Sequence, residues 1–249
     1  MRSFRLTVAY DGTEFHGWQV QPGLRTVQGV LEEALDRIGI ERRSRVAGAG
    51  RTDAGVHAAG QVASFTAGTR LPARAVLALV RRELPADVRV REVAEVEADF
   101  HARHRATARR YAYRLLWREH GLWERFAWCP PRVPDGERIE RAVREIEGAH
   151  DFAAFQASGG GPGGTTCRVF RAGWTGWEAG LRFDVIADHF LYHMVRNIVG
   201  TALASAMQAD PARHMRDVLN SLSRGAGGVT APAQGLTLEQ VFYCAEARA

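Results

Sequence analysis

The sequence predicts an α+β fold made of two α/β subdomains, each with the split β-α-β order that is typical of ferredoxin-like and RRM-like domains. Two observations predict it. Short segments with apolar residues at every second position, typical of strands, alternate with segments whose apolar residues recur every three or four positions, typical of helices. The same order of segments occurs in both halves of the 249-residue chain. We therefore expect a largely antiparallel mixed sheet, with subdomains at residues 1–105 and 106–249.

The N-terminal half begins with a half-buried strand, because apolar residues alternate with polar or small ones over residues 4–10. A helix follows, since the apolar residues between 27 and 38 share one helical face and Thr26 is a suitable N-cap. The remaining elements expected in this half are strands near residues 44–49, 60–66 and 88–93 and a helix over 73–84.

The C-terminal half repeats this order with one helix added. Residues 111–115 alternate as a strand, and the apolar residues of 139–146 form a helical stripe. A strongly apolar helical face over 191–206 follows two further strands. The other elements expected here are strands at 167–176 and 181–187, a helix at about 212–223 and a last strand at 236–244.

Composition excludes several kinds of chemistry. The chain has a net charge of +5, and all 33 of its Lys and Arg residues are arginine. Without lysine there is no Schiff base, no pyridoxal phosphate anchor and no P-loop lysine. The three cysteines are far apart in the sequence and predict neither a disulfide framework nor a zinc knuckle. With no long apolar run and no signal-peptide core at the N-terminus, we expect a cytosolic protein.

One carboxylate, Asp53, lies in a loop almost free of bulky side chains. Glycines at positions 48, 50 and 55 allow tight turns and the close approach of a large ligand. Arg51, two residues away, suits a carboxylate that is kept ionised and presented to a substrate. The alternative is an aspartate that caps a turn.

A basic segment at residues 101–118 contains six arginines, two histidines and no acidic residue. A solvated run of charge is the simple explanation. Tyr111 and Tyr113 favour a second one, because cations beside aromatic rings suit phosphates and unstacked bases. The segment therefore suggests contact with nucleic acid.

A third candidate is the helix after residue 188, on which His189, His193, Arg196 and Gly200 are spaced three or four apart. These residues predict a basic stripe, although they can also be ordinary boundary residues. A zinc site at His189 and His193 is disfavoured, because the glutamate of H-E-x-x-H is missing and no third ligand is evident. We expect no metal.

Along nearly its whole length, the sequence resembles the TruA family of tRNA pseudouridine synthases. The segments that carry the resemblance occur in the family's order. They are Tyr10-Asp-Gly-Thr, Gly17-Trp-Gln, Ala49-Gly-Arg-Thr-Asp-Ala-Gly-Val-His57, Asp99-Phe-His-Ala-Arg, Ala106-Thr-Ala-Arg-Arg-Tyr111, His193-Met-Val-Arg-Asn-Ile-Val-Gly200 and Thr230-Ala-Pro-Ala-Gln-Gly-Leu236.

The resemblance implies a role for four residues. Asp53 matches the catalytic aspartate, and Tyr111 matches the tyrosine that packs on the target base and helps to remove its C5 proton. Arg196 matches the basic residue that pairs with the aspartate, and Arg51 matches an arginine that fills the gap left by the extruded base. Three further residues are candidate RNA contacts: Arg109, Arg110 and His193.

The resemblance also implies the activity, the partners and the place of the site. Uridines at positions 38, 39 and 40 of the tRNA anticodon stem-loop would be isomerised to pseudouridine, in a cleft between the two subdomains. The enzyme would be a homodimer whose tRNA contacts both subunits, with no cofactor. The carboxylate can attack the base or the sugar, or assist elimination at the sugar, and the residues leave all three routes open. The alternatives are a non-catalytic RNA-binding or chaperone protein and, less favoured, a metal-dependent RNA hydrolase.

Overall fold

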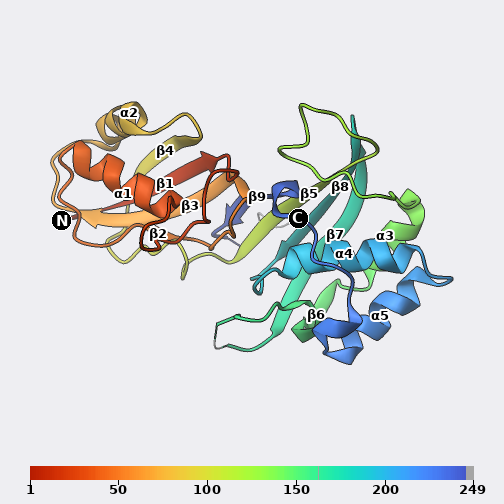
Figure 1. Cartoon of the computed structure of the whole chain (residues 1–249). Helices are drawn as coiled ribbons and strands as arrows, with labels where there is room; N and C mark the ends of the chain where they lie inside the picture. Colours follow the sequence, from red (N-terminus) through yellow and green to blue (C-terminus); the bar gives the residue numbers. More distant parts are fainter. Residues whose placement is uncertain (162, 245–249) are drawn as a thin grey trace. The chain divides into compact units, whose positions relative to one another are not determined.

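The computed structural model of the chain describes residues 1–161 and 163–244, and these form two compact units (Figure 1). Of the described residues, the first unit contains Met1–Thr107 and Leu238–Cys244, and the second contains Ala108–Thr237. Helices and mostly antiparallel strands occur in both units, which confirms the predicted α+β class. None of the helices in the described residues is both long enough and apolar enough to cross a membrane.

The first unit is a sheet with two helices. Its elements are β1 (Arg2–Tyr10), α1 (Val27–Arg37), β2 (Ala47–Gly48), β3 (His57–Ala67), α2 (Ala73–Glu83), β4 (Val88–Val96) and β9 (Leu236–Phe242), which enters this unit at Leu238. The strand order is β4-β1-β3-β9, with β2 paired to β3. Strand β1 is antiparallel to both β3 and β4, as a split β-α-β arrangement requires.

The core of the first unit follows from the periodicity of its elements. Phe4, Leu6 and Val8 on β1 are completely buried, so the predicted alternation is confirmed. Helix α1 begins where expected, because the Thr26 hydroxyl accepts a hydrogen bond from the Gly29 backbone N–H at 3.3 Å. Helices α1 and α2 pack against each other beside the sheet (Figure 1).

The second unit is built from β5 to β8 and three α-helices. Its elements are β5 (Ala108–Leu116), α3 (Gly136–Arg144), β6 (Gly148–Asp151), β7 (Thr166–Trp177), β8 (Gly180–Ala187), α4 (Met194–Ala206) and α5 (Pro211–Ser221), with short 3₁₀ helices at Ala153–Phe155, Arg224–Ala226 and Ala233–Gly235. The strand order is β5-β8-β7-β6, and each neighbouring pair is antiparallel.

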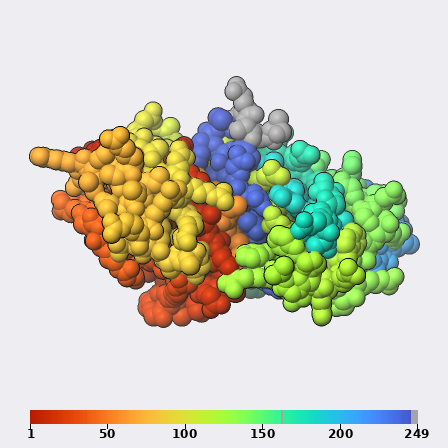
Figure 2. Space-filling model, turned by 90° about the horizontal axis from the view of Figure 1, so that it is seen from above, coloured from red at the N-terminus to blue at the C-terminus, as the bar shows by residue number. Residues whose placement is uncertain are grey.

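The helices α3, α4 and α5 pack together, and α3 also packs on β7 (Figure 1). The predicted helical stripe of α3 is confirmed, because Ile139, Ala142 and Val143 are fully buried. In Figure 2, the light green chain around residues 117–130 lies on the surface of this unit. Two of its apolar side chains, Trp117 and Leu122, are largely exposed.

Two predicted elements differ from the observed ones, and one observed strand was not predicted. The strand expected at 44–49 is reduced to β2, Ala47–Gly48. The helix expected from residue 191 begins only at Met194, because His193 has a φ of 60° and ends the preceding turn in the left-handed region. Strand β6 was not predicted, since the polar sequence of Gly148–Asp151 lacks the alternation of a strand and depends on pairing with β7.

Candidate active site

The loop that carries Asp53 connects β2 to β3, and hydrogen bonds hold its backbone on the sheet side. The Ala49 N–H donates to the Val62 carbonyl at 2.7 Å. The side chain of Gln61, which is completely buried, donates from Nε2 to the Gly50 carbonyl at 2.9 Å. The loop therefore leaves the sheet in a defined direction just before Asp53.

The segment after β1 holds the other side of the loop. The Trp18 N–H donates to the Thr52 carbonyl at 3.0 Å, and the Gly55 N–H donates to the Phe15 carbonyl at 3.2 Å. Gly17 has a φ of +86°, and a Cβ at this position would lie 2.7 Å from the Thr52 carbonyl oxygen. Glycine at position 17 is thus required both by the backbone conformation and by the close approach of the two segments.

The phenol of Tyr10 reaches the loop from inside the first unit. Its hydroxyl lies 2.7 Å from Thr52 Oγ1 in a buried hydrogen bond. Burial raises the pKa of Tyr10 to about 12, although hydrogen bonds from Thr52 and Gln61 oppose this shift. Sequence reasoning placed Tyr10 on an inward-facing strand position but did not connect it with the Asp53 loop.

These contacts leave the loop itself accessible. Thr52 and Val56 are buried, Asp53 is half-buried, and Arg51 and Ala54 are exposed. The main chain around Asp53 is therefore fixed by hydrogen bonds to β3 and to the segment after β1. The two residues that flank the Thr52-Asp53 pair face solvent. This geometry suits a carboxylate that is presented to a large ligand.

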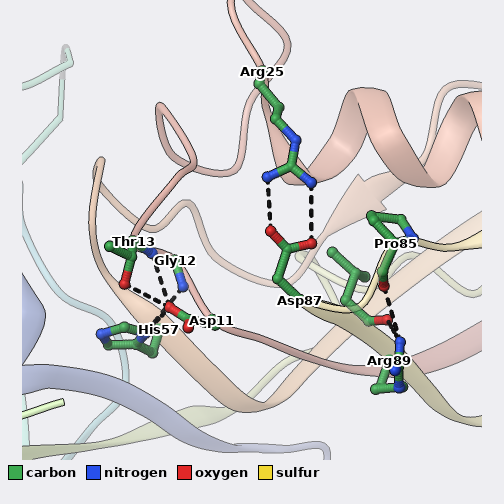
Figure 3. A network of polar contacts seen from close by, with 9 residues as sticks. Asp11, Gly12, Thr13, Arg25, His57, Pro85, Asp87 and Arg89 are labelled. Atoms are coloured by element: carbon green, nitrogen blue, oxygen red, sulfur yellow. Dashed lines mark hydrogen bonds and ion pairs between the residues drawn. The ribbon is translucent and has the colours of Figure 1, made fainter. Parts of the chain in front are cut away.

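A second polar group lies where the loop joins β3 (Figure 3). His57 Nδ1 accepts a hydrogen bond from the Gly12 N–H at 3.0 Å. The Asp11 Oδ1 atom, 3.2 Å from the same nitrogen, accepts instead from the Thr13 hydroxyl at 2.6 Å and the Thr13 N–H at 3.0 Å. The chain thus turns sharply after β1.

Arg25 holds the end of the segment that runs from β1 to α1. Its guanidinium makes two hydrogen bonds to Asp87, at 2.8 and 3.0 Å (Figure 3), and lies over the Phe15 ring at 4.1 Å from the centroid. A bidentate pair restrains both side chains more than a single contact does. The sequence did not predict this pair, because its members are 62 residues apart.

In the second unit, Tyr111 lies on β5 opposite Val185 of β8 and is only 7% exposed. Its ring is edge-to-face with Phe190, with centroids 5.0 Å apart. The neighbouring arginines are engaged within the unit. Arg109 donates to the Asp188 carbonyl at 2.8 Å, and Arg110 donates to the Asp184 carboxylate at 2.9 and 2.7 Å.

Arg196, in the first turn of α4, is half-buried and bonded to the chain that follows α5. Its Nε donates to the Ala231 carbonyl at 2.7 Å, and the Ala231 N–H donates back to the Arg196 carbonyl at 3.1 Å. The next residue, Asn197, is completely buried and accepts from the Thr230 hydroxyl at 2.7 Å. Both α4 residues therefore depend on the 230–231 segment for their orientation.

His193 does not lie in the helix with Arg196, as expected from the sequence, but directly precedes it as the N-cap residue. Its ring packs on the Tyr192 ring with centroids 3.9 Å apart. His189 is further still from the helix, so the predicted helical stripe of His189, His193 and Arg196 is wrong. The left-handed turn at His193 breaks the periodicity on which that prediction rested.

Residues that could hold a metal ion also occur in the second unit. In the described part of the chain, the ligand atoms of Cys167, Asp188 and His189 lie within 4.8 Å of one another. From the sequence, a metal site at His189 and His193 was disfavoured; in the structure His189 contacts a cysteine 22 residues before it. Pairing of β7 with β8 accounts for this contact.

Comparison with known proteins identifies the family of the chain. The family described as tRNA pseudouridine synthase matches residues 6–104 and 142–244, which include both the Asp53 loop and Arg196. Three relatives, each called tRNA pseudouridine synthase A, match 98% of this chain. They come from Syntrophotalea carbinolica (41% identity, 97% of the relative covered), Moorella thermoacetica (40%, 100% covered) and Acetivibrio thermocellus (36%, 100% covered). This chain therefore belongs to the tRNA pseudouridine synthases, which are isomerases that act on uridine in tRNA.

Proposed function

We propose that this synthase isomerises uridines 38, 39 and 40 of the tRNA anticodon stem-loop, with Asp53 as the nucleophile. The observation that carries the proposal is the way in which the Asp53 loop is held. Hydrogen bonds to the main chain of Gly50, Thr52 and Gly55 fix the loop, while Asp53 itself stays half-buried beside exposed neighbours. A carboxylate on a fixed backbone loses little freedom when it meets the reacting atom.

The reaction breaks the N1–C1′ bond of uridine and forms a C5–C1′ bond after the base has turned. C5 loses a proton and N1 gains one, so the product has the same atoms as the substrate. A carboxylate can attack C6 of the base, attack C1′ of the sugar, or assist elimination at the sugar. Each of these routes needs Asp53 in its ionised form.

We assign the target base to the face of Tyr111 and the counter-charge of Asp53 to Arg196. Extrusion of a base from its stack costs a few kcal/mol, and stacking on an aromatic ring offsets about 1–3 kcal/mol. The edge-to-face contact with Phe190 supports this role, because it fixes the plane of the Tyr111 ring. The bonds between Arg196 and Ala231 likewise hold the guanidinium in one orientation.

We expect the remaining basic residues to contact RNA to different extents. Arg51 is exposed, which supports a place in the gap left by the extruded base. Arg109 and Arg110 are half-buried and already bonded to Asp188 and Asp184, so each should add less to RNA affinity than Arg51. We include His193, beside the first turn of α4, as a weaker RNA contact.

We also propose that the enzyme is a cytoplasmic homodimer whose tRNA contacts both subunits, and that it needs no cofactor. The isomerisation supports the last point, since it transfers no electrons and consumes no second substrate. Sedimentation equilibrium should give a mass of twice 27.5 kDa. A mass of 27.5 kDa at micromolar concentration would contradict the dimer.

The test uses unmodified tRNA transcripts and carbodiimide labelling followed by primer extension. Wild type should give stops at positions 38, 39 and 40, and replacing one of these uridines by cytidine should remove only the corresponding stop. Asp53→Asn, which keeps the shape of the side chain but removes its charge, should abolish all stops while tRNA binding remains. Asp36→Asn, a change on the exposed face of α1, is the matched control and should retain full activity.

Two results would overturn different parts of the proposal. Stops only outside the anticodon arm would refute the assigned substrate positions. Full activity of Asp53→Asn would refute the nucleophile but leave the substrate assignment intact. A non-catalytic RNA-binding protein, the alternative from another class, would bind the transcript and give no stops at all.

A further inference from the structure

The side chains of Cys167, Asp188 and His189 form a polar cluster at one end of the β7–β8 pair. Cys167 is the second residue of β7, and Asp188 and His189 directly follow β8. Cys167 Sγ lies 3.3 Å from His189 Nε2, and His189 Nδ1 lies 3.0 Å from Asp188 Oδ1. The imidazole is therefore placed between a thiol and a carboxylate.

The two contacts orient the imidazole. The Asp188 carboxylate oxygen lies at ion-pair distance from His189 Nδ1 and so favours the tautomer with the hydrogen on Nδ1, while Nε2 faces the Cys167 sulfur. The same Oδ1 atom accepts from the backbone N–H groups of His189 at 2.7 Å and Arg168 at 3.0 Å. Two backbone N–H groups thus hold the carboxylate oxygen beside the imidazole.

This is the arrangement in which proteins present histidine to a metal ion: a carboxylate binds one ring nitrogen and the other nitrogen is left for the metal. Zinc bonds of about 2.3 Å to sulfur and 2.1 Å to nitrogen in tetrahedral geometry separate the two ligand atoms by about 3.6 Å. The Sγ–Nε2 distance of 3.3 Å needs to increase by only a few tenths of an ångström. Both ligand atoms are therefore close to binding positions.

The three side chains of the cluster differ in their exposure to solvent. Cys167 is 1% exposed, whereas the side chains of His189 and Asp188 are 47% and 40% exposed. An ion between the thiol and the imidazole would have protein on one side and solvent on the other, so water can complete its coordination. The Asp188 carboxylate, together with Asp151 near the thiol, supplies the negative charge that a cation needs.

Other uses of the cysteine fit less well. Burial and the carboxylates of Asp188 and Asp151 raise the pKa of Cys167 to about 12, so the free thiol stays protonated and is a poor nucleophile or redox group. Cys129, Cys167 and Cys244 are all unpaired by disulfides in the structure. A metal ion differs from these alternatives, because it displaces the thiol proton itself.

We propose that Cys167 Sγ and His189 Nε2 bind a divalent transition-metal ion of the zinc type, with Asp188 as the positioning residue for the imidazole. The Cys167 thiol proton passes to solvent as the sulfur–metal bond forms, and water molecules occupy the remaining positions. The ion links the start of β7 to the segment that leads into α4. The uridine isomerisation does not use this site, so the proposal is independent of the roles assigned to Asp53 and Tyr111.

Cobalt(II), which takes the place of zinc, provides the direct test. Titration of the metal-free protein with Co²⁺ should produce a sulfur-to-cobalt charge-transfer band, and Cys167→Ser should abolish it. His189→Gln should weaken Co²⁺ binding by at least about tenfold, and Asp188→Asn should weaken it by about tenfold through the loss of imidazole orientation. The matched controls, Cys129→Ser and His214→Gln, should bind Co²⁺ as the wild type does.

A second measurement guards against variants that fold poorly. Zn²⁺ should raise the melting temperature of wild type and of both controls but not that of Cys167→Ser, since an ion that binds only the folded state stabilises it. Circular dichroism of each metal-free variant reports its folding. Absence of the charge-transfer band in wild type, or a band of equal intensity in Cys167→Ser, would overturn the proposal.

Discussion

The buried hydroxyl of Tyr10 contacts the Asp53 loop through the adjacent Thr52 side chain. We expect Tyr10→Phe to lower kcat for pseudouridine formation about tenfold while KM changes less than twofold, because a loosened loop misplaces Asp53 without removing an RNA contact. The lost hydrogen bond should also reduce the free energy of unfolding by about 1–2 kcal/mol. Single-turnover kinetics and urea unfolding measure the two effects.

Tyr243→Phe is the matched control for this prediction. The Tyr243 hydroxyl donates to the Ala102 carbonyl at 2.9 Å, in the same unit but not in the Asp53 loop. Its loss should reduce stability by a similar amount and leave kcat unchanged. Equal kcat values for Tyr10→Phe and Tyr243→Phe would show that Tyr10 has no positioning role.

Tyr10 also predicts a dependence of stability on alkaline pH. Its pKa is about 12 in the folded chain, against 10.0 as the reference value, so between these values the unfolded state binds fewer protons than the folded state. Its contribution is complete below pH 10 and is lost as the pH rises toward 12. Between pH 9 and pH 11, wild type should lose about 1 kcal/mol more stability than Tyr10→Phe. Urea unfolding at several pH values measures this, and parallel pH profiles would contradict it.

At the scale of elements, α4 and the segment 228–231 are in unusually close contact. A Cβ on Gly200 would overlap the Val229 carbonyl oxygen, and the Gly228 N–H donates to the Thr201 hydroxyl at 3.0 Å. Neither partner can move freely, because Arg196 and Asn197 are bonded to residues 230 and 231. Glycine at position 200 is therefore a packing requirement in a helix that would otherwise favour alanine.

We expect Gly200→Ala to destabilise the protein by about 1–3 kcal/mol through overpacking. Gly136→Ala is the matched control, since Gly136 begins α3 and a Cβ there would meet no atom within 4 Å. That change should be neutral or stabilise by up to about 1 kcal/mol. Chemical denaturation compares the two, and a Gly200→Ala variant as stable as Gly136→Ala would refute the packing argument.

Several elements were predictable because their signals are local. The stripe of α3 and the Thr26 cap of α1 depend on residues within one or two turns, and both were predicted correctly. The start of α4 was not, because the left-handed conformation of His193 has no local signature in a histidine. Strand β6 also escaped prediction, since its hydrogen bonds come from β7, which lies further along the chain.

At the scale of the whole molecule, charge should govern tRNA affinity. The chain has a net charge of +5 and its cations are all arginine. We expect tRNA affinity to fall at least about tenfold between 50 and 200 mM salt. The release of counterions from the tRNA phosphates favours binding, and it does so less strongly as the salt concentration rises. Filter binding measures the affinity, and kcat at saturating tRNA, which should stay constant, is the internal control. Affinity independent of salt would mean that phosphate contacts contribute little.

The sequence by itself determined the α+β class, most of the helices and strands, and the motifs that identify the family. It could do so because alternation, helical stripes and short motifs are properties of residues close together in the chain. The tertiary structure alone brought Tyr10 to Thr52, Arg25 to Asp87, and Cys167 to His189. These contacts join residues 42, 62 and 22 positions apart, and their geometry depends on strand register and loop conformation that no local pattern encodes.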